Sequence, residues 1–114
     1  MAAIQRISKR GEVEMMDRVA LIDRVLDEIN RAEARFPGWP EDPLHALAIL
    51  GEEFGELNKS VMQRVYEPHK DGASMEDFLD EGIQVAAMAV RFLENLRYYE
   101  WDPCEQQTRV FDAV

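Results

Sequence analysis

The stretch HALAILGEEFGELNKSVM, residues 45–62, decides the fold of this 114-residue chain. Its large apolar side chains return every three or four residues, at Leu47, Leu50, Phe54, Leu57 and Val61. This spacing is typical of a helix that packs along one face. The helix is predicted to begin at Asp42-Pro43, because aspartate is a good N-cap and proline is favoured in the first turn, and to end near Val65.

Three carboxylates, Glu52, Glu53 and Glu56, crowd into five positions of this helix, beside Gly51 and Gly55. Glutamates one helical turn apart repel each other, and each glycine costs about 1 kcal/mol relative to alanine in a helix interior. A helix selected only for stability would not combine these features. The segment therefore predicts a divalent cation that offsets the repulsion and a bulky ligand beside the glycines. The alternative is a solvated acidic face without a ligand.

Two further long helices are predicted around this one. The first covers residues 12–35 and repeats apolar residues at Met15, Val19, Ile22, Leu26 and Ile29, a typical bundle seam. It ends at the proline- and glycine-containing turn 36–40. The third covers residues 74–99, with Ser74 as N-cap. Its middle, residues 83–90, is almost wholly apolar or small, so we expect other helices to enclose it. Gly82 and the alanines beside it are expected to permit close packing.

The expected fold class is all-α: an antiparallel bundle of three long helices plus a short C-terminal helix within residues 101–114. Residues 1–11 are predicted to be a flexible N-terminal segment, and residues 12–114 a single domain. Three such helices expose too many apolar faces for a lone monomer. We therefore expect a homodimer or homotetramer that completes the bundle.

Composition narrows the range of partners. The net charge is −10, which argues against binding of nucleic acid or of anionic membranes. No apolar run is long enough to span a membrane. The one cysteine, Cys104, has no partner for an intrachain disulfide, and we interpret it as an ordinary thiol in a reducing compartment, the cytoplasm.

A second acidic stripe follows on the third helix, where Asp77, Asp80, Glu81 and Gln84 share one face. If the second and third helices are antiparallel, Glu53 and Glu56 face Glu81 across the groove. Ligands that are all carboxylate or amide oxygens suit Mg²⁺, or alternatively Mn²⁺. A metal there favours hydrolysis of a phosphoanhydride, with a spare carboxylate accepting the proton of the attacking water. Without metal, the clustered carboxylates should raise one another's pKa values.

Four residues outside the stripes are candidates for contact with a nucleotide substrate. Lys59 and Lys70 are possible phosphate ligands or plain surface charges. Trp39 either stacks on a base or packs against the end of the bundle. His45 lies on the Glu52 side of its helix and either supports the site or is a bundle-end histidine.

The two stripes together resemble the MazG-like family of the all-α nucleoside triphosphate pyrophosphatases, whose motif is E-E-x-x-E on one helix and E-x-x-D on the next. The resemblance covers residues 45–96. It implies an oligomeric helical bundle, Mg²⁺ dependence and cleavage of nucleotides to monophosphate and pyrophosphate. It assigns metal binding to Glu53, Glu56 and Glu81, and places Glu52 in the same catalytic cluster as Glu53.

The chain departs from the family motif at Gln84, which stands where the family has aspartate. Gln84 offers an amide oxygen to a metal but no charge. Asp80, beside Glu81, is a candidate source of the missing charge. A second possible register is Asp77-x-x-Asp80, one turn earlier.

Three functions remain open from the sequence. The first is a Mg²⁺-dependent pyrophosphohydrolase acting on a (d)NTP or a related nucleotide. The second is a catalytically weakened protein of the same fold that binds a nucleotide or a metal. The third is a helical interaction protein whose acidic face serves only solvation.

Overall fold

The computed structural model describes residues 17–69 and 74–102. These residues form three α-helices: α1 (Arg18–Arg35), α2 (Pro43–Tyr66) and α3 (Met75–Glu94). A short 3-10 helix, η1 (Leu96–Tyr98), follows α3. The described part of the chain contains no β-strand, so the all-helical class predicted from the sequence is confirmed.

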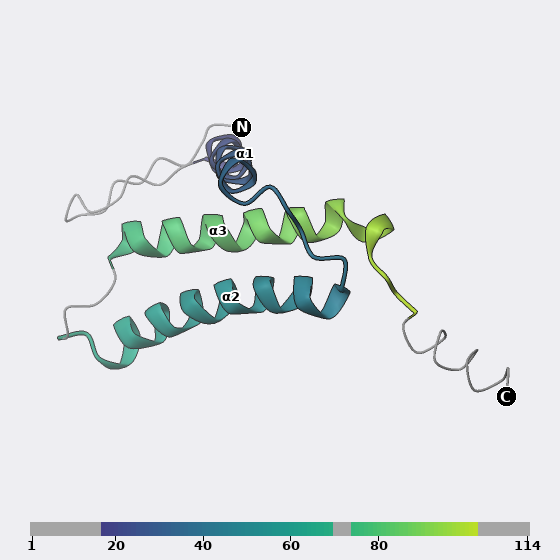
Figure 1. The fold of residues 1–114 in the computed structure, drawn as a ribbon. Helices are drawn as coiled ribbons and strands as arrows, with labels where there is room; N and C mark the ends of the chain where they lie inside the picture. Colours follow the sequence, from purple (N-terminus) through teal and green to yellow (C-terminus); the bar gives the residue numbers. More distant parts are fainter. Residues whose placement is uncertain (1–16, 70–73, 103–114) are drawn as a thin grey trace, which may run out of the picture.

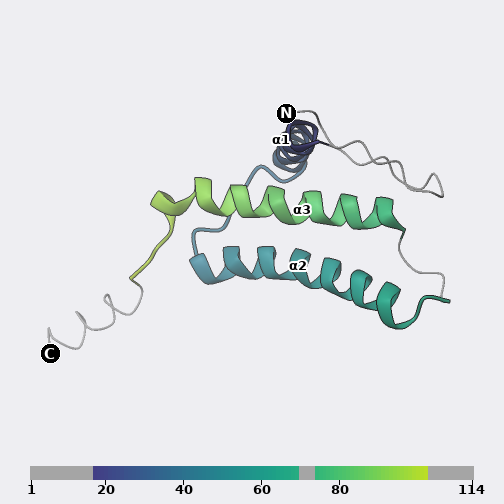
Figure 2. The same cartoon turned by 180° about the vertical axis from the view of Figure 1, so that it is seen from behind.

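The helix α3 lies in the middle and packs against both other helices (Figure 1). The helices α2 and α3 run antiparallel along each other, as predicted. The helix α1 lies on the opposite side of α3 and crosses it at a steep angle, so that it is seen nearly end-on in both views (Figures 1 and 2). Only α2 and α3 therefore form the expected antiparallel pair.

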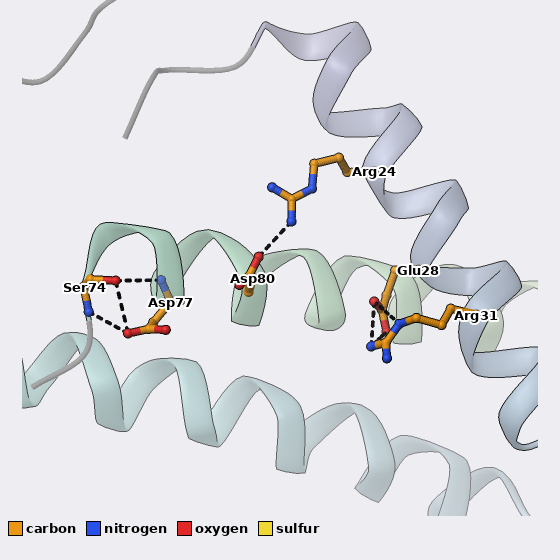
Figure 3. Close-up of polar contacts among 6 residues, drawn as sticks. All are labelled: Arg24, Glu28, Arg31, Ser74, Asp77 and Asp80. Carbon is orange, nitrogen blue, oxygen red and sulfur yellow. Dashed lines mark hydrogen bonds and ion pairs between the residues drawn. The ribbon is translucent and has the colours of Figure 1, made fainter. Parts of the chain in front are cut away.

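Local sequence accounts for where the helices begin. Asp42 caps α2 through a 2.9 Å hydrogen bond from the amide of Leu44, and Pro43 occupies the first turn. Ser74 and Asp77 form a reciprocal capping box at the start of α3 (Figure 3). Both predicted starts are confirmed. The helix α3 ends at Glu94, earlier than predicted, because the next residues tighten into η1.

The middle of α3 is enclosed, as its sequence predicted. From Ile83 to Ala89 no residue is exposed, and Ile83 and Ala87 are buried, whereas Val90, the last residue of the predicted run, is 36% exposed. Small side chains here leave room for helices on two sides. A Cβ added at Gly82, however, would meet no atom within 4 Å, so this glycine is not needed for close packing among the described residues.

The apolar faces of α1 and α2 differ from the predicted seams. On α1, Ile29 is buried, whereas Val19, Ile22 and Leu26 are 68%, 51% and 52% exposed. On α2, five of the seven exposed large apolar side chains lie along one helical line, and the other two are Met62 and Tyr66. The line consists of Leu44, Leu47, Phe54, Val61 and Val65. Each helix carries apolar residues on more than one line, and spacing alone does not say which line meets α3.

The helix α1 begins at Arg18 with Asp17 as its N-cap, later than the predicted start at residue 12. Some predictions fall outside the described residues, namely the flexible segment 1–11, residues 12–16 of the first helix, Lys70, and the C-terminal helix beyond residue 102. Within the described ranges, none of the helices combines the length and the apolar character that crossing a bilayer requires.

Candidate functional site

Glu53 is the centre of the candidate site. It lies half-buried on the face of α2 that packs against α3. Burial raises the pKa of its carboxyl above the ordinary value of 4.5, and the charges of Glu56, Glu52, Glu28 and Glu81 raise this pKa further. The rise in pKa predicted for the clustered carboxylates is therefore found at Glu53, with burial as its largest cause. These five carboxylates come from three helices, so the tertiary fold brings them together.

Glu81 of α3 lies opposite Ser60 of α2, does not line the cavity described below, and holds an unsatisfied oxygen. Its Oε1 accepts a 3.1 Å hydrogen bond from the hydroxyl of Ser60 on α2. Its Oε2 is buried and has no hydrogen-bond partner among the described residues. A buried carboxylate oxygen without a donor is costly, which makes it a natural contact for a cation or for a ligand hydrogen-bond donor.

A cavity of about 510 Å³ opens beside Glu53, where all three helices meet the 36–40 turn. This volume lies in the range of small-molecule sites. Its polar lining contains two kinds of residue: acids or an amide (Glu28, Glu53, Gln84) and arginines (Arg31, Arg35, Arg91). Glu28 and Arg35 on α1, and likewise Gln84 and Arg91 on α3, are seven positions apart, about 10 Å of helix, whereas Arg31 is ion-paired with Glu28. The cavity therefore has a carboxylate side and an arginine side.

Trp39 lines this cavity, and a hydrogen bond to Tyr99 fixes its indole ring. Its indole N–H donates a 2.7 Å hydrogen bond to the hydroxyl of Tyr99, which donates in turn to the carbonyl of Phe92 at 3.0 Å. The guanidinium carbon of Arg91 lies 4.6 Å from the centre of the Trp39 ring. Trp39 thus packs against the end of α3 and at the same time presents an aromatic surface to the cavity.

The structure does not bring every candidate residue to this cavity. Lys59 is exposed and lines a different depression, shared with Gly55 and Tyr66. His45 is exposed and does not line the cavity. Glu52 and Glu56 are also exposed, although their charges act on Glu53.

Asp80 and Asp77 are engaged elsewhere. Asp80 accepts a 2.7 Å ion-pair contact from Arg24 of α1 and remains about half exposed (Figure 3). Asp77 accepts hydrogen bonds from the amide and the hydroxyl of Ser74. The alternative register Asp77-x-x-Asp80 is thus occupied by a helix cap and by an interhelical ion pair.

Four charged residues of the cavity, Glu28, Arg31, Arg35 and Arg91, were not predicted from the sequence. Glu28 of α1, with a side chain only 16% exposed, is clasped by Arg31 through contacts of 2.8 to 3.1 Å (Figure 3). Arg91 of α3 is 6% exposed. The one sequence feature that singles out Arg91 is its charge at the end of an otherwise apolar helical run. Glu28 looks like any other charge on α1 until the crossing with α3 is known.

The donor chemistry fits a hard divalent cation in part. Carboxylate and amide oxygens of Glu53, Glu81 and Gln84 are suitable ligands for Mg²⁺, and the orphaned oxygen of Glu81 lacks a partner. Within residues 17–69 and 74–102, however, no three acidic, histidine or cysteine side chains converge into a group that holds an ion. Coordination therefore requires side-chain rotation, for example of the exposed Glu56.

Comparisons with family models, with curated proteins and with solved structures found no match for this chain.

Tyr99→Phe is expected to loosen the aromatic wall of the cavity. It leaves the indole N–H of the half-buried Trp39 without its acceptor, which should lower the free energy of unfolding by about 1 to 2 kcal/mol. Chemical denaturation measures this loss, and Trp39 fluorescence in a Trp101→Phe background reports the indole environment. Tyr98→Phe, at an exposed neighbour, is the matched control. Equal stability of Tyr99→Phe and Tyr98→Phe would contradict a stabilising hydrogen bond between Trp39 and Tyr99.

Proposed function

We propose that this chain is a Mg²⁺-dependent nucleotide pyrophosphohydrolase that converts a (d)NTP or a related nucleotide to its monophosphate and pyrophosphate. The observation that supports this most is the position of Glu53, half-buried at the cavity and surrounded by four other carboxylates from three helices. Such repulsion is offset when a cation binds among the carboxylates. The two-part motif on α2 and α3 favours the same chemistry.

Each residue of the cluster has a proposed role. Glu53, Glu81 and Glu56 hold the metal, with Gln84 as a neutral ligand, and Glu28 adds negative charge near Glu53. When bound, the metal neutralises phosphate charge and acidifies a water molecule. Glu53 and Glu52 are the proposed catalytic carboxylates, and a protein carboxylate in this cluster accepts the proton of the attacking water. Asp80 is a weaker candidate ligand because it pairs with Arg24.

The direct test is a panel of ribo- and deoxyribonucleoside triphosphates incubated with the full chain and either Mg²⁺, Mn²⁺ or a chelator. We expect pyrophosphate and nucleoside monophosphate in equal amounts, only when metal is present. Release of inorganic phosphate instead would indicate cleavage at another phosphoanhydride bond. No product from any nucleotide with either metal would refute the enzymatic proposal.

A non-catalytic binding protein of the same fold is the second candidate. Two observations favour it: Gln84 contributes no charge to the cavity, and the described carboxylates do not converge into a three-ligand group. Calorimetry with Mg²⁺ and a non-hydrolysable nucleotide analogue separates the two candidates, because binding without turnover selects the second. The third reading, an interaction protein without a ligand, predicts that Mg²⁺ leaves the melting temperature unchanged.

The proposed assembly is a homodimer that covers the exposed apolar lines of α1 and α2. Val19, Ile22 and Leu26 follow one another on α1, and the exposed line of α2 extends from Leu44 to Val65. Monomeric proteins rarely expose apolar side chains in such continuous rows. A tetramer built from two such dimers is the alternative arrangement.

A further inference from the structure

Arg91 is the one charged residue that is buried in the described part of the chain. Its Nη2 donates a single 3.3 Å hydrogen bond to the carbonyl of Phe36, at the C-cap of α1. No carboxylate among the described residues lies within ion-pair distance of its guanidinium. A guanidinium has five N–H donors, and buried charges in proteins are normally paired with an opposite charge. The hydrogen bond to the C-cap of α1 therefore uses only one of the N–H donors of Arg91.

The remaining donors of Arg91 border open space. Among the described residues, the one buried side-chain nitrogen or oxygen without a hydrogen-bond partner is Oε2 of Glu81. Each nitrogen of the Arg91 guanidinium is therefore either hydrogen-bonded or accessible to solvent. The side chain lines the 510 Å³ cavity and also a neighbouring cavity of about 250 Å³. Glu33 and Glu94 line the smaller cavity, but neither carboxylate forms an ion pair with Arg91.

Two more arginines of α1 line the larger cavity with Arg91. Arg35 stacks on Phe36, with its guanidinium carbon 5.5 Å from the ring centre, and it has no carboxylate partner among the described residues. Arg31 is bound to Glu28 and is 60% exposed. In a chain of net charge −10, this cavity therefore gathers cations, two of which are not neutralised by the described residues.

We propose that Arg91 and Arg35, with Arg31 at the rim, form a subsite for a phosphate-type oxyanion, which takes the polyphosphate tail of the ligand. Guanidinium groups bind phosphate oxygens through paired, charge-assisted hydrogen bonds, and enclosure strengthens these bonds. The subsite lies about 10 Å along α3 from Gln84, so one ligand reaches both the arginines and the carboxylate side. This proposal rests on the proposed function for the choice of a polyphosphate ligand.

The test measures anion binding without divalent metal, which separates it from turnover. Isothermal titration calorimetry in the presence of a chelator compares inorganic tripolyphosphate, a nucleoside triphosphate and an uncharged nucleoside. We expect the two phosphate compounds to bind and the nucleoside to give no measurable heat. Arg91→Gln should weaken tripolyphosphate binding by about 10- to 100-fold, and Arg35→Gln by several-fold. Arg97→Gln, at an exposed arginine outside the cavity, is the matched control.

Two further variants address a structural role of Arg91. Arg91→Lys keeps the charge but loses the paired geometry, so it should bind more tightly than Arg91→Gln and more weakly than the wild type. If Arg91→Gln fails to fold, the exposed Arg35→Gln decides. The proposal is overturned if the wild type binds no tripolyphosphate without metal, or if Arg35→Gln and every folded Arg91 variant bind it as the wild type does.

The outcomes for this subsite and for the enzymatic proposal are distinguishable. If anion binding without metal depends on Arg91, and no nucleotide is turned over with Mg²⁺ or Mn²⁺, the subsite is supported and the hydrolase is refuted. If turnover depends on Mg²⁺, but substituting Arg91 or Arg35 leaves tripolyphosphate binding unchanged, the hydrolase is supported and the subsite is refuted. A preference for tripolyphosphate over every nucleotide would identify inorganic polyphosphate as the source of the bound oxyanion.

Discussion

Replacing Glu53 with glutamine is expected to abolish most turnover and, at the same time, to stabilise the metal-free protein. Removing a charged metal ligand should lower the turnover rate by at least about 100-fold. The same change removes a half-buried carboxylate that four neighbouring carboxylates repel, so the melting temperature without metal should rise. A substitution that only damages the fold lowers both the turnover rate and the melting temperature. A lower turnover rate together with a higher melting temperature would therefore identify Glu53 as a functional residue.

The measurement pairs a pyrophosphate-release assay with thermal melts in chelator and in Mg²⁺. Mg²⁺ should raise the melting temperature of the wild type more than that of Glu53→Gln, because only the folded state presents the complete site. Glu41→Gln removes one exposed carboxylate at the start of α2 and is the matched control, with turnover and metal response unchanged. A Glu53→Gln protein that turns over normally would exclude Glu53 from the chemistry.

The raised pKa of Glu53 also makes a prediction about pH. Below pH 4.5 the carboxyl is protonated in the folded and unfolded states, so it does not affect stability. As the pH rises through the raised pKa of the folded state, ionisation destabilises the fold. The stability difference between metal-free Glu53→Gln and wild type should therefore grow from about pH 4.5 towards neutral pH. Denaturant unfolding at several pH values measures this difference in the free energy of unfolding. A difference that does not change with pH would contradict a raised pKa at Glu53.

Phe54→Glu is expected to convert the proposed homodimer into monomers. Phe54 is 58% exposed on the apolar line of α2, and burying a phenylalanine contributes roughly 1.5 to 3 kcal/mol. In a twofold-symmetric dimer each substitution acts twice, so the loss is about 3 to 6 kcal/mol, a factor of about 10² to 10⁴ in Kd. Gly51 lies one turn before Phe54, and a Cβ there would meet no atom within 4 Å, which leaves space for a partner helix.

Sedimentation equilibrium of the wild type, Phe54→Glu and Tyr98→Glu tests the assembly. Tyr98 is 71% exposed but belongs to η1 and not to the apolar lines of α1 and α2, so Tyr98→Glu should remain dimeric. A wild type that is monomeric at high micromolar concentration would refute the dimer. Equal dissociation of both variants would show that the interface lies elsewhere.

The sequence by itself determined the elements that depend on neighbouring residues. The caps at Asp42 and Ser74 and the enclosed middle of α3 follow from local hydrogen bonding and from side-chain periodicity, and all three were confirmed. The predicted antiparallel pairing of the second and third helices was also sufficient to predict that the charges of Glu53 and Glu81 act on each other. An antiparallel pair of helices with a short connection leaves few other arrangements.

Only the tertiary structure decided which line of α1 packs inward and which charges reach the cavity. The helix α1 crosses α3, and its predicted seam is mostly exposed, because several apolar lines on one helix are nearly equivalent until a partner selects one. That crossing carries Glu28 towards Glu53, and the turn containing Trp39 covers Arg91. These pairs are 25 and 52 positions apart in the sequence, and such contacts depend on packing, which local spacing does not encode.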